Sequence, residues 1–520
     1  MSKNDKKELK DLDNQAFDLI IVGGGATGLG IGIDSITRGY KTLLIEKFDY
    51  AKGTSSRSTK LIHGGVRYLA QFNIPLVKEA LHEKALLEQN APHLVHECAF
   101  VTPIYNILSL PYYYLGLSWY HNLLGSHKKS KYKTRLLSKS ETIKKIPNIK
   151  TEGLKCSVVY YDDSFDDARM AISMLRTFTE KGGFAFNYAE LVSFTKENGK
   201  ISGAVIKDRM TEEEAIIKSN CIINATGIFA DAIRKLDDTN APSIIRPSQG
   251  THLIIKKDKF NTDCAMLIPK TSDNRVLFAV PWHDGIVCGS TDVSIDKIEE
   301  EPKSLESEIK FIIDNMNNYL NHKISRNDVQ SVYTGIRPLI IDPQGEQNTS
   351  KISRDEKIFV SDSNLITIAG GKYTTYRKMA EKTLKKAIEN NLISNSTSIT
   401  ENLKLHGYLE KEEVLSMPEP FRVYGSDFQT LSKMEGFNNK IHADLPLNEA
   451  QISFAIEFEQ AKTVEDILSR RTRSLLLNAK ATIEATPRIA EIMMHKLGKS
   501  EEWKNEQIKS FTEIAKKYLV

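Results

Sequence analysis

The sequence is poor in cysteine, and its few cysteines follow no pattern. Five cysteines (Cys98, Cys156, Cys221, Cys264 and Cys288) are scattered along 520 residues without a CxxC pair. An odd, unpatterned set argues against a disulfide framework and a zinc site, and it indicates reduced thiols in a cytoplasmic compartment.

Net charge is also low, at +4, which is too small to indicate nucleic-acid binding. The N-terminal residues 1–15 are charged and lack the apolar core of a signal peptide. Internal repeats and low-complexity tracts are missing as well. With 520 residues, 40% of them apolar, the chain is too long for one ordinary core, and two or three domains are expected.

One long stretch, residues 98–126, lacks Asp, Glu, Lys and Arg altogether. Pro103 and Pro111 interrupt it, so a membrane-spanning helix, which needs roughly 20 predominantly apolar residues, is not expected. Its Tyr and Trp residues stand beside leucines and are followed by a basic run at 128–135, as at a membrane interface. A buried segment of a second domain followed by a solvated loop is the open alternative.

The strongest motif lies in residues 17–47. An apolar run at 17–22 precedes Gly23-x-Gly25-x-x-Gly28, a helical stretch follows, and a second apolar run ends at Glu46. This pattern predicts a βαβ unit: the first glycine permits the tight turn, the second lets a pyrophosphate approach, and the third lets the helix pack on the strand. The helix start would face the phosphates, and Glu46 would bind ribose hydroxyls. The motif therefore predicts dinucleotide binding.

A second glycine-containing segment follows, TSSRSTKLIHGGVRYL at residues 54–69. Together with the βαβ unit it resembles the flavin-dependent glycerol-3-phosphate dehydrogenases, which belong with the D-amino-acid oxidase and glutathione reductase type flavoproteins. The resemblance implies FAD, held non-covalently, although His63 could carry a covalent flavin. It extends over residues 16–480 and includes the blocks 246–254, 333–339 and 368–377.

The resemblance implies a fold class of α/β plus α+β. It predicts a discontinuous two-dinucleotide-binding-fold FAD domain (16–72, 150–240 and 356–392), a β-sheet substrate-binding and membrane-facing domain (73–149 and 241–355), and a helical C-terminal domain (393–520). Asn198-Gly199 predicts a hairpin turn, and helices are expected at 74–97, 449–459, 463–477 and 485–496. Glu465 and Asp466 are expected to pair with Arg470 and Arg471.

The resemblance also assigns residues. The expected cofactor contacts are Gly23, Gly25, Ala26, Thr27, Gly28, Glu46, Lys47, Thr54, Ser55, Ser58, His63, Gly64, Gly65, Ala225, Thr226, Gly227, Gly371, Lys372 and Thr374. The expected substrate contacts are Arg67, Tyr68, His252, Thr291, Arg337, Arg354 and Lys372, of which His252, Arg337 and Lys372 are catalytic. His252 or Lys372 would accept the hydroxyl proton, and the sequence does not choose between them.

No metal site is expected, because the acids at 162–167 lack the spacing of a calcium loop and suit a helix start. The predicted reaction is oxidation of sn-glycerol 3-phosphate to dihydroxyacetone phosphate, with hydride transfer to flavin N5 and electrons passed to membrane quinone. The expected location is the inner face of the cell membrane, bound peripherally, and the oligomeric state stays open, with a homodimer one option. Rival predictions are an oxidase that releases hydrogen peroxide, an amino-acid or 2-hydroxy-acid oxidising flavoprotein, and a membrane-interaction protein with structural FAD.

Overall fold

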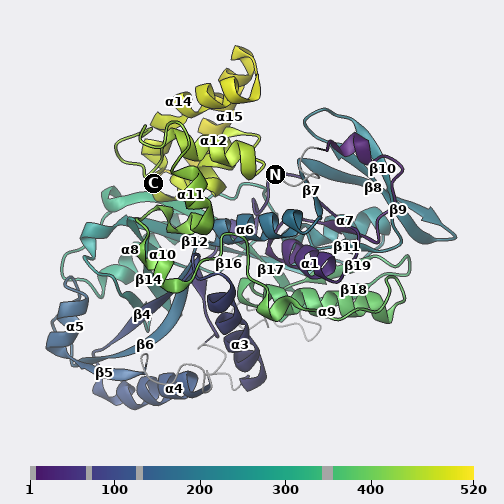
Figure 1. Ribbon diagram of the computed structural model, residues 1–520. Coiled ribbons are helices and arrows are strands. Elements are labelled where there is room, and N and C mark those ends of the chain that lie inside the picture. The colour runs from purple at the N-terminus through teal and green to yellow at the C-terminus, as the bar shows by residue number, and fades with distance from the viewer. Residues whose placement is uncertain (1–6, 66–72, 124–132, 274, 342–354) are drawn as a thin grey trace.

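The computed structural model describes residues 7–65, 73–123, 133–273, 275–341 and 355–520. Within these ranges the strands form three sheets (Figure 1). The C-terminal helices lie at one edge of the molecule, and helix α4 lies at the opposite edge.

The six-stranded sheet is built from segments far apart in the chain. Its order is β18-β19-β11-β1-β2-β7, parallel except for β18, and its inner strands are continuous apolar runs, as expected for strands covered on both faces. Helices α6 and α9 both pack against α1. The bounds are β1 Leu19–Val22, α1 Ala26–Thr37, β2 Thr42–Glu46, α6 Asp167–Glu180, β7 Phe184–Asn187, β11 Ile222–Asn224, β18 Lys357–Val360, β19 Ile366–Ala369 and α9 Tyr376–Glu389.

The three-stranded sheet has the order β10-β9-β8. Its strands are β8 Ala189–Glu197, β9 Lys200–Asp208 and β10 Glu214–Lys218. Asn198 and Gly199 both have positive φ, 51° and 76°, as the predicted hairpin turn requires. After β9 the chain forms β10 in this sheet and then β11 (Ile222–Asn224) in the six-stranded sheet. The short helix α7 (Ala230–Asp237) follows β11.

The ten-stranded sheet has the order β16-β12-β15-β14-β13-β4-β6-β3, with β17 paired to β12 and β5 to β6. The predicted domain division stays a proposal; β3 and β6, which it assigns to the FAD unit, run in this sheet because β6 pairs with β4 along its full length. The bounds are β3 Leu61–Ile62, β4 Val95–Ile104, β5 Arg135–Ser138, α5 Lys139–Lys145, β6 Cys156–Phe165, β12 Ile245–Lys256, β13 Ala265–Ile268, β14 Leu277–Trp282, β15 Gly285–Gly289, β16 Val293–Ser294, α8 Glu306–Asn317 and β17 Val329–Ile340.

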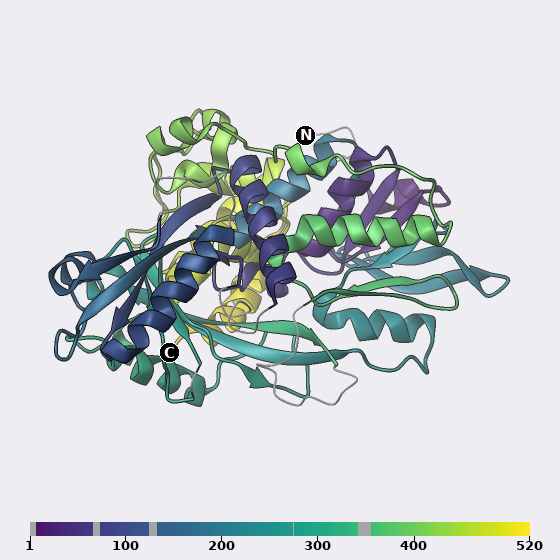
Figure 2. The ribbon, with the colours of Figure 1, turned by 90° about the horizontal axis from the view of Figure 1, so that it is seen from below.

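Residues 74–123 form two helices with strand β4 between them. Helix α3 is Ile74–Asn90 and is shorter than predicted, because Pro92 disfavours helical geometry at Ala91. The uncharged stretch that follows contains buried β4, a short 3₁₀ turn and helix α4 (Leu110–Leu123). Helices α3 and α4 contact each other on the side shown in Figure 2. Among the described residues, no helix is long and apolar enough to cross a bilayer.

The C-terminal region (residues 393–520) is helical, as expected. The helix predicted at 463–477 is broken, because Arg473 adopts φ 58° between a π-helical turn, η12 (Asp466–Arg471), and α13. The other helices are α10 Lys411–Ser416, α11 Phe428–Leu431, α12 Glu449–Phe458, α13 Ser474–Leu477, α14 Ala479–Leu497 and α15 Glu501–Ala515, with a final 3₁₀ turn, η13, at Lys516–Tyr518.

Candidate active site

A cavity of about 1640 Å³ runs along the carboxyl edge of the six-stranded sheet and continues to the ten-stranded sheet. It exceeds the range of about 300–1,000 Å³ that is usual for small-ligand pockets. Three turns converge on it, each following a strand of the same sheet: 23–26 after β1, 225–227 after β11 and 370–374 after β19. Ligands in open α/β sheets bind at this edge.

The glycines of the first turn are fixed by close backbone approach. Gly23 has φ +112°, and a Cβ atom there would lie 2.7 Å from the carbonyl oxygen of Ala225. A Cβ on Gly28 would collide with the carbonyl oxygen of Gly23, so α1 packs directly on the turn. Gly28 therefore acts in helix packing and does not line the cavity, whereas Gly23, Gly25, Ala26 and Thr27 do.

The carboxylate at the end of β2 holds the next turn in place. Glu46 Oε2 accepts a hydrogen bond from the amide of Gly24 (2.7 Å), and Oε1 accepts one from the amide of Phe48 (2.9 Å). Burial raises the pKa of Glu46 despite these two bonds. Glu46 and Lys47 both line the cavity, so the carboxylate lies where the motif predicts a ribose contact.

Hydrogen bonds to the start of α1 and to Asp167 hold the hydroxyl-rich segment at residues 54–59 in place. Ser55 Oγ accepts from the amide of Ala26 at the start of α1 (3.0 Å). Ser58 donates through its amide and its hydroxyl to Asp167 (3.0 and 2.7 Å). Lys60, fully buried, also pairs with Asp167 (2.7 Å), and burial lowers the pKa of this lysine. Thr54, Ser55 and Ser58 line the cavity, as do His63 and Gly65.

His252 lies on β12, in the wall formed by the ten-stranded sheet. Its ring stacks on Tyr333 of β17, with centroids 4.8 Å apart and planes 10° apart, and its Nε2 shares a hydrogen bond with Thr59 (2.9 Å). Among the described residues, Nδ1 has no hydrogen-bond partner. Burial, and then the nearby cations Arg337 and Lys60, lower the pKa of His252 well below its ordinary value. The imidazole is therefore neutral at physiological pH.

Arg337 on β17 presents a guanidinium to the same part of the cavity. It donates to Ser290 Oγ (2.8 Å), to the carbonyl of Thr291 (3.1 Å) and to that of Gln249 (3.3 Å). A side chain at Gly250 would collide with this guanidinium, so glycine is needed there. The hydroxyl of Thr291 donates to buried Glu308 (2.5 Å), so Thr291 lines the cavity with its donor already used in the scaffold.

The third turn brings Lys372 to the same cavity, beside Gly371 and Thr374. Gly370 and Gly371 have positive φ, 77° and 79°, and a 3₁₀ turn at 373–375 leads into α9. The second turn contributes Ala225, Thr226 and Gly227. Arg67, Tyr68 and Arg354 lie outside the described residues, so their predicted roles stay predictions.

Gly64 differs from its predicted role. Its amide donates to the hydroxyl of Tyr120 on α4 (2.7 Å), and a Cβ there would collide with Leu81 of α3. Gly64 is thus a packing glycine beneath the cavity wall. The Tyr120 hydroxyl also donates to Asp162 (3.0 Å), which Lys84 pairs at 2.9 Å.

Several cavity residues had no recognisable sequence signal. Arg275 lines the cavity and donates to the carbonyl of Asp292 (3.1 Å), but it stands in no motif. Phe100 and Tyr160, on neighbouring strands, form an aromatic wall. Glu190, Leu191 and Val192 also line the cavity. Only the aromatic residues of α4 could have been suspected from composition.

Helix α4 lines the cavity and carries exposed apolar side chains. Tyr112 and Leu115 are each 65% exposed, and Trp119 is 41% exposed. All three also line the cavity. Ile107 and Leu108, in the preceding turn, are exposed as well. The uncharged stretch therefore divides into buried β4 and an exposed helix, and the membrane-interface interpretation of that helix stays a prediction.

The acids at 162–167 form ion pairs. Asp166 caps α6 by accepting from the amide of Arg169 (3.0 Å) and pairs with Arg473 (2.7 Å). Asp162 and Asp163 lie near Lys84, and Asp167 pairs with Lys60. In the described parts of the chain, no group of three or more His, Cys, Asp or Glu side chains could hold a metal ion.

Comparison with known proteins agrees with this geometry. Residues 18–376 match the family model of FAD dependent oxidoreductases, and residues 366–504 match the C-terminal domain of alpha-glycerophosphate oxidase. The chain belongs to the FAD-dependent oxidoreductase family. A mitochondrial glycerol-3-phosphate dehydrogenase of Rattus norvegicus is 40% identical, over 97% of this chain and 74% of that protein, which confirms the family resemblance.

Two solved structures share the fold. The FAD complex of the glycerol-3-phosphate dehydrogenase from Bacillus halodurans superposes with a TM-score of 0.80 at 27% identity, over 98% of this chain and 97% of that one. An L-alpha-glycerophosphate oxidase from Mycoplasma pneumoniae with FAD bound gives a TM-score of 0.56 at 16% identity, over 74% of this chain and 96% of that one. FAD is therefore the cofactor of this flavoprotein, as predicted.

The residues around the cavity fit FAD. The volume suits a dinucleotide, and the close approach of Gly23 to Ala225 leaves no room for a side chain at Gly23. The start of α1 directly follows this turn, so its dipole favours the pyrophosphate. The turn at Gly371 follows β19 and leads into α9, and it lines the cavity together with His252 and Arg337.

Proposed function

We propose that the protein oxidises sn-glycerol 3-phosphate to dihydroxyacetone phosphate and passes the electrons to membrane quinone. One observation carries the proposal: His252, Arg337 and Lys372 come from three distant segments and line one cavity, which also holds the dinucleotide turns. The names of the relatives supply the substrate. Bound FAD supplies the hydride acceptor, at N5 of its isoalloxazine ring.

Arg337 is proposed to bind the phosphate of the substrate. Its hydrogen bonds to Ser290, Thr291 and Gln249 fix the plane of the guanidinium, so little side-chain entropy is lost when a phosphate binds. Lys372 would add a second cation. Two cations suit a phosphate dianion better than the single carboxylate of an amino acid or 2-hydroxy acid, which makes those substrates weaker candidates.

His252 is proposed to accept the hydroxyl proton of the substrate as hydride leaves the carbon that bears that hydroxyl. A base must be unprotonated before reaction, and burial keeps the imidazole in that form. The bond to Thr59 and the stack on Tyr333 fix the ring orientation. Lys372 is the alternative base.

The exposed face of α4 supports a membrane site for the quinone. Tyr112, Leu115 and Trp119 are exposed and also line the cavity, so an apolar acceptor at the bilayer surface would meet the cavity at this helix. Aromatic and leucine side chains suit the membrane interface. We propose peripheral attachment through α4 to the inner face of the cell membrane, with Arg135 close to the headgroups; the predicted lysines at 128–131 lie outside the described residues.

The test is anaerobic mixing of purified protein with glycerol 3-phosphate while the oxidised flavin band near about 450 nm is followed. Rapid bleaching, reversed by added quinone, is the expected result. Reversal by oxygen with release of hydrogen peroxide would instead establish the oxidase. A yellow protein that does not bleach would refute the substrate, and a structural FAD would then be the better explanation.

A further inference from the structure

The loop at residues 47–59, here called the cofactor loop, has one face on the cavity and another on distant parts of the chain. Apart from the short 3₁₀ turn at 54–56 it has no regular secondary structure. Its residues from Lys47 to Thr59 form much of the cavity lining. Hydrogen bonds within a helix or sheet therefore do not fix this loop, and other contacts must do so.

We infer that the C-terminal helical region is a clamp that holds the cofactor loop in the conformation that binds FAD, with Asp49, Lys52 and Arg57 as the positions it grips. This inference rests on the proposal that the cavity is the FAD site. It gives the C-terminal region a role in cofactor retention, although none of the residues 393–520 lines the cavity.

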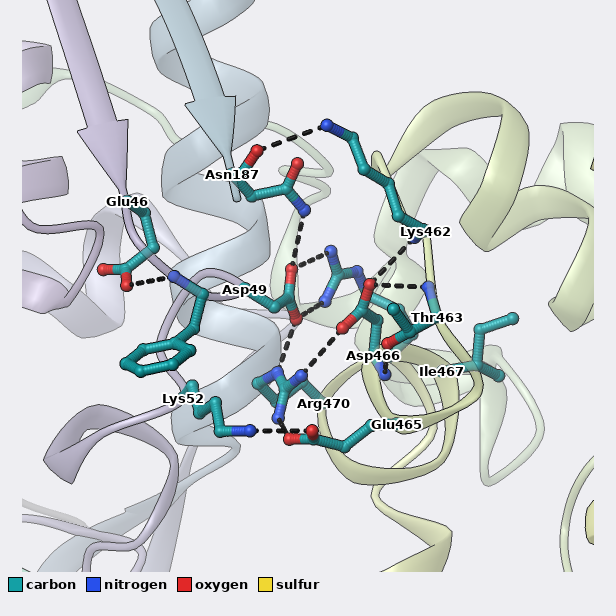
Figure 3. A network of polar contacts seen from close by, with 12 residues as sticks. Glu46, Asp49, Lys52, Asn187, Lys462, Thr463, Glu465, Asp466, Ile467 and Arg470 are labelled. Atoms are coloured by element: carbon teal, nitrogen blue, oxygen red, sulfur yellow. Dashed lines mark hydrogen bonds and ion pairs between the residues drawn. The ribbon is translucent and has the colours of Figure 1, made fainter. Parts of the chain in front are cut away.

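The first grip is at Asp49, which is fully buried. Its carboxylate lies between two arginines of the C-terminal region, with Arg470 Nε at 2.5 Å and Arg471 Nη2 at 2.8 Å (Figure 3). Asn187 at the end of β7 donates to the same carboxylate (3.1 Å). Burial alone would raise the pKa of Asp49, but Arg471 and Arg470 hold it well below its usual value.

The same cluster grips the loop again at Lys52. Lys52 Nζ lies 2.7 Å from Glu465, which also pairs with Arg470 (2.8 Å). Asp466 lies on the other side of Arg470 (2.9 Å), so this one arginine joins three carboxylates (Figure 3). Between the two grips, the Tyr50 hydroxyl donates to Gln460 (2.9 Å).

The last grip lies at the other end of the loop. Arg57 donates to Glu301 (2.7 Å), whose second carboxylate oxygen accepts from the hydroxyl of Tyr518 (2.7 Å). Lys517 donates to the Glu301 carbonyl (3.0 Å). The final 3₁₀ turn of the chain therefore holds Glu301 against the cofactor loop.

The inner face of the loop shows why its position matters for FAD. Ser55, between the grips at Lys52 and Arg57, accepts from the amide of Ala26 in the first turn of α1. This contact, and the hydrogen bonds that the Glu46 carboxylate accepts from Phe48 in the loop and Gly24 in the turn, set the distance between the loop and the phosphate-facing turn. Because ordering a backbone segment costs conformational entropy, a loop that is ordered before binding gives tighter binding than one ordered by FAD.

The test compares FAD affinity in full-length variants, measured by titrating apoprotein with FAD and following flavin fluorescence. The variant Glu465→Gln/Tyr518→Phe weakens two grips and replaces no cavity-lining residue. The control Asp427→Asn loosens the contact of the C-terminal region with Arg176, and an ion pair with His406 inside that region, both away from the loop. The two carboxylates are matched in exposure, 13% for Glu465 and 16% for Asp427.

The clamp predicts that the double variant raises the FAD dissociation constant by at least about tenfold and that the control raises it less than about twofold. Apoprotein melting temperatures check folding, and Tyr518→Phe alone, expected to weaken FAD binding in the same direction, replaces the double variant if that does not fold. Unchanged FAD affinity, or an equal loss in the control, would overturn the clamp. Wild-type protein that binds no FAD would instead refute the proposed function.

Discussion

His252 offers the sharpest test of the proposed chemistry. Replacing it with alanine removes the neutral imidazole, its bond to Thr59 and its stack on Tyr333. General base catalysis contributes about 10²–10⁴-fold in rate. We therefore expect His252→Ala to slow anaerobic flavin reduction by at least about tenfold, which corresponds to about 1.4 kcal/mol of barrier. Lys372→Ala tests the alternative base in the same single-turnover assay.

The pH profile adds a second criterion. Burial and neighbouring cations depress the pKa of His252 well below 6.5, so the base form is fully populated above that pH and is lost only on acidification through the lowered value. The rate of flavin reduction at saturating substrate should therefore show no inflection near 6.5 that depends on His252. An inflection there that disappears in His252→Ala would show that the residue titrates normally. If neither alanine variant slows reduction tenfold, the acid–base assignment is wrong.

Three further predictions follow from named contacts. Arg337→Lys keeps the positive charge but loses the planar fork, so kcat/KM for glycerol 3-phosphate should fall by about 10–100-fold, with FAD content unchanged as the control. Leu115→Glu places a charge on the exposed face of α4 and should abolish co-sedimentation with anionic vesicles, whereas Leu415→Glu, at an exposed leucine of the C-terminal region, should not. Burial would raise the pKa of Glu465, but Arg470 and Lys52 lower it from 4.5 to about 2. The ionised Glu465 therefore stabilises the folded protein fully above pH 4.5, and this stabilisation is lost as the pH falls toward 2. In urea unfolding, Glu465→Gln should remove about 3 kcal/mol of the acid dependence of the unfolding free energy.

The parts of the fold that were predicted from sequence are those with local causes. The βαβ unit needs only apolar runs and glycines within 30 residues, and the Asn198-Gly199 turn needs only two residues that tolerate positive φ. The predicted helix boundaries were wrong where a residue outside the helical pattern decides where the helix ends. Pro92 ends α3 early, and Arg473 leaves the helical region where its side chain reaches Asp166.

The site shows the same limit. Glycines and hydroxyls in motifs lie around the cavity, and Gly28 packs α1 on the first turn, as the motif predicts. Gly64 instead packs against α3 and α4, which the motif does not reveal. Arg275 belongs to no motif and enters the cavity only through the strand pairing of the large sheet. The predicted pairing of Glu465 and Asp466 with Arg470 agrees with the structure, whereas Arg471 pairs with Asp49, 422 residues away. No spacing rule reaches that far.

The arrangement separates two roles at opposite edges of the molecule. Helix α4 lies at one edge and the C-terminal helices lie at the other (Figure 1). The cavity is lined by α4 and by the cofactor loop. If α4 rests on a bilayer, the C-terminal region faces away from it and cannot contribute to membrane binding. Changes in the clamp should therefore alter FAD affinity and leave vesicle binding intact. Leu108, in the turn before α4, is exposed and does not line the cavity, so Leu108→Glu should weaken vesicle binding and leave FAD affinity intact. A variant of either kind that altered both properties would show that the cofactor loop and α4 are coupled through the hydrophobic cluster that Leu117 of α4 shares with the C-terminal helices.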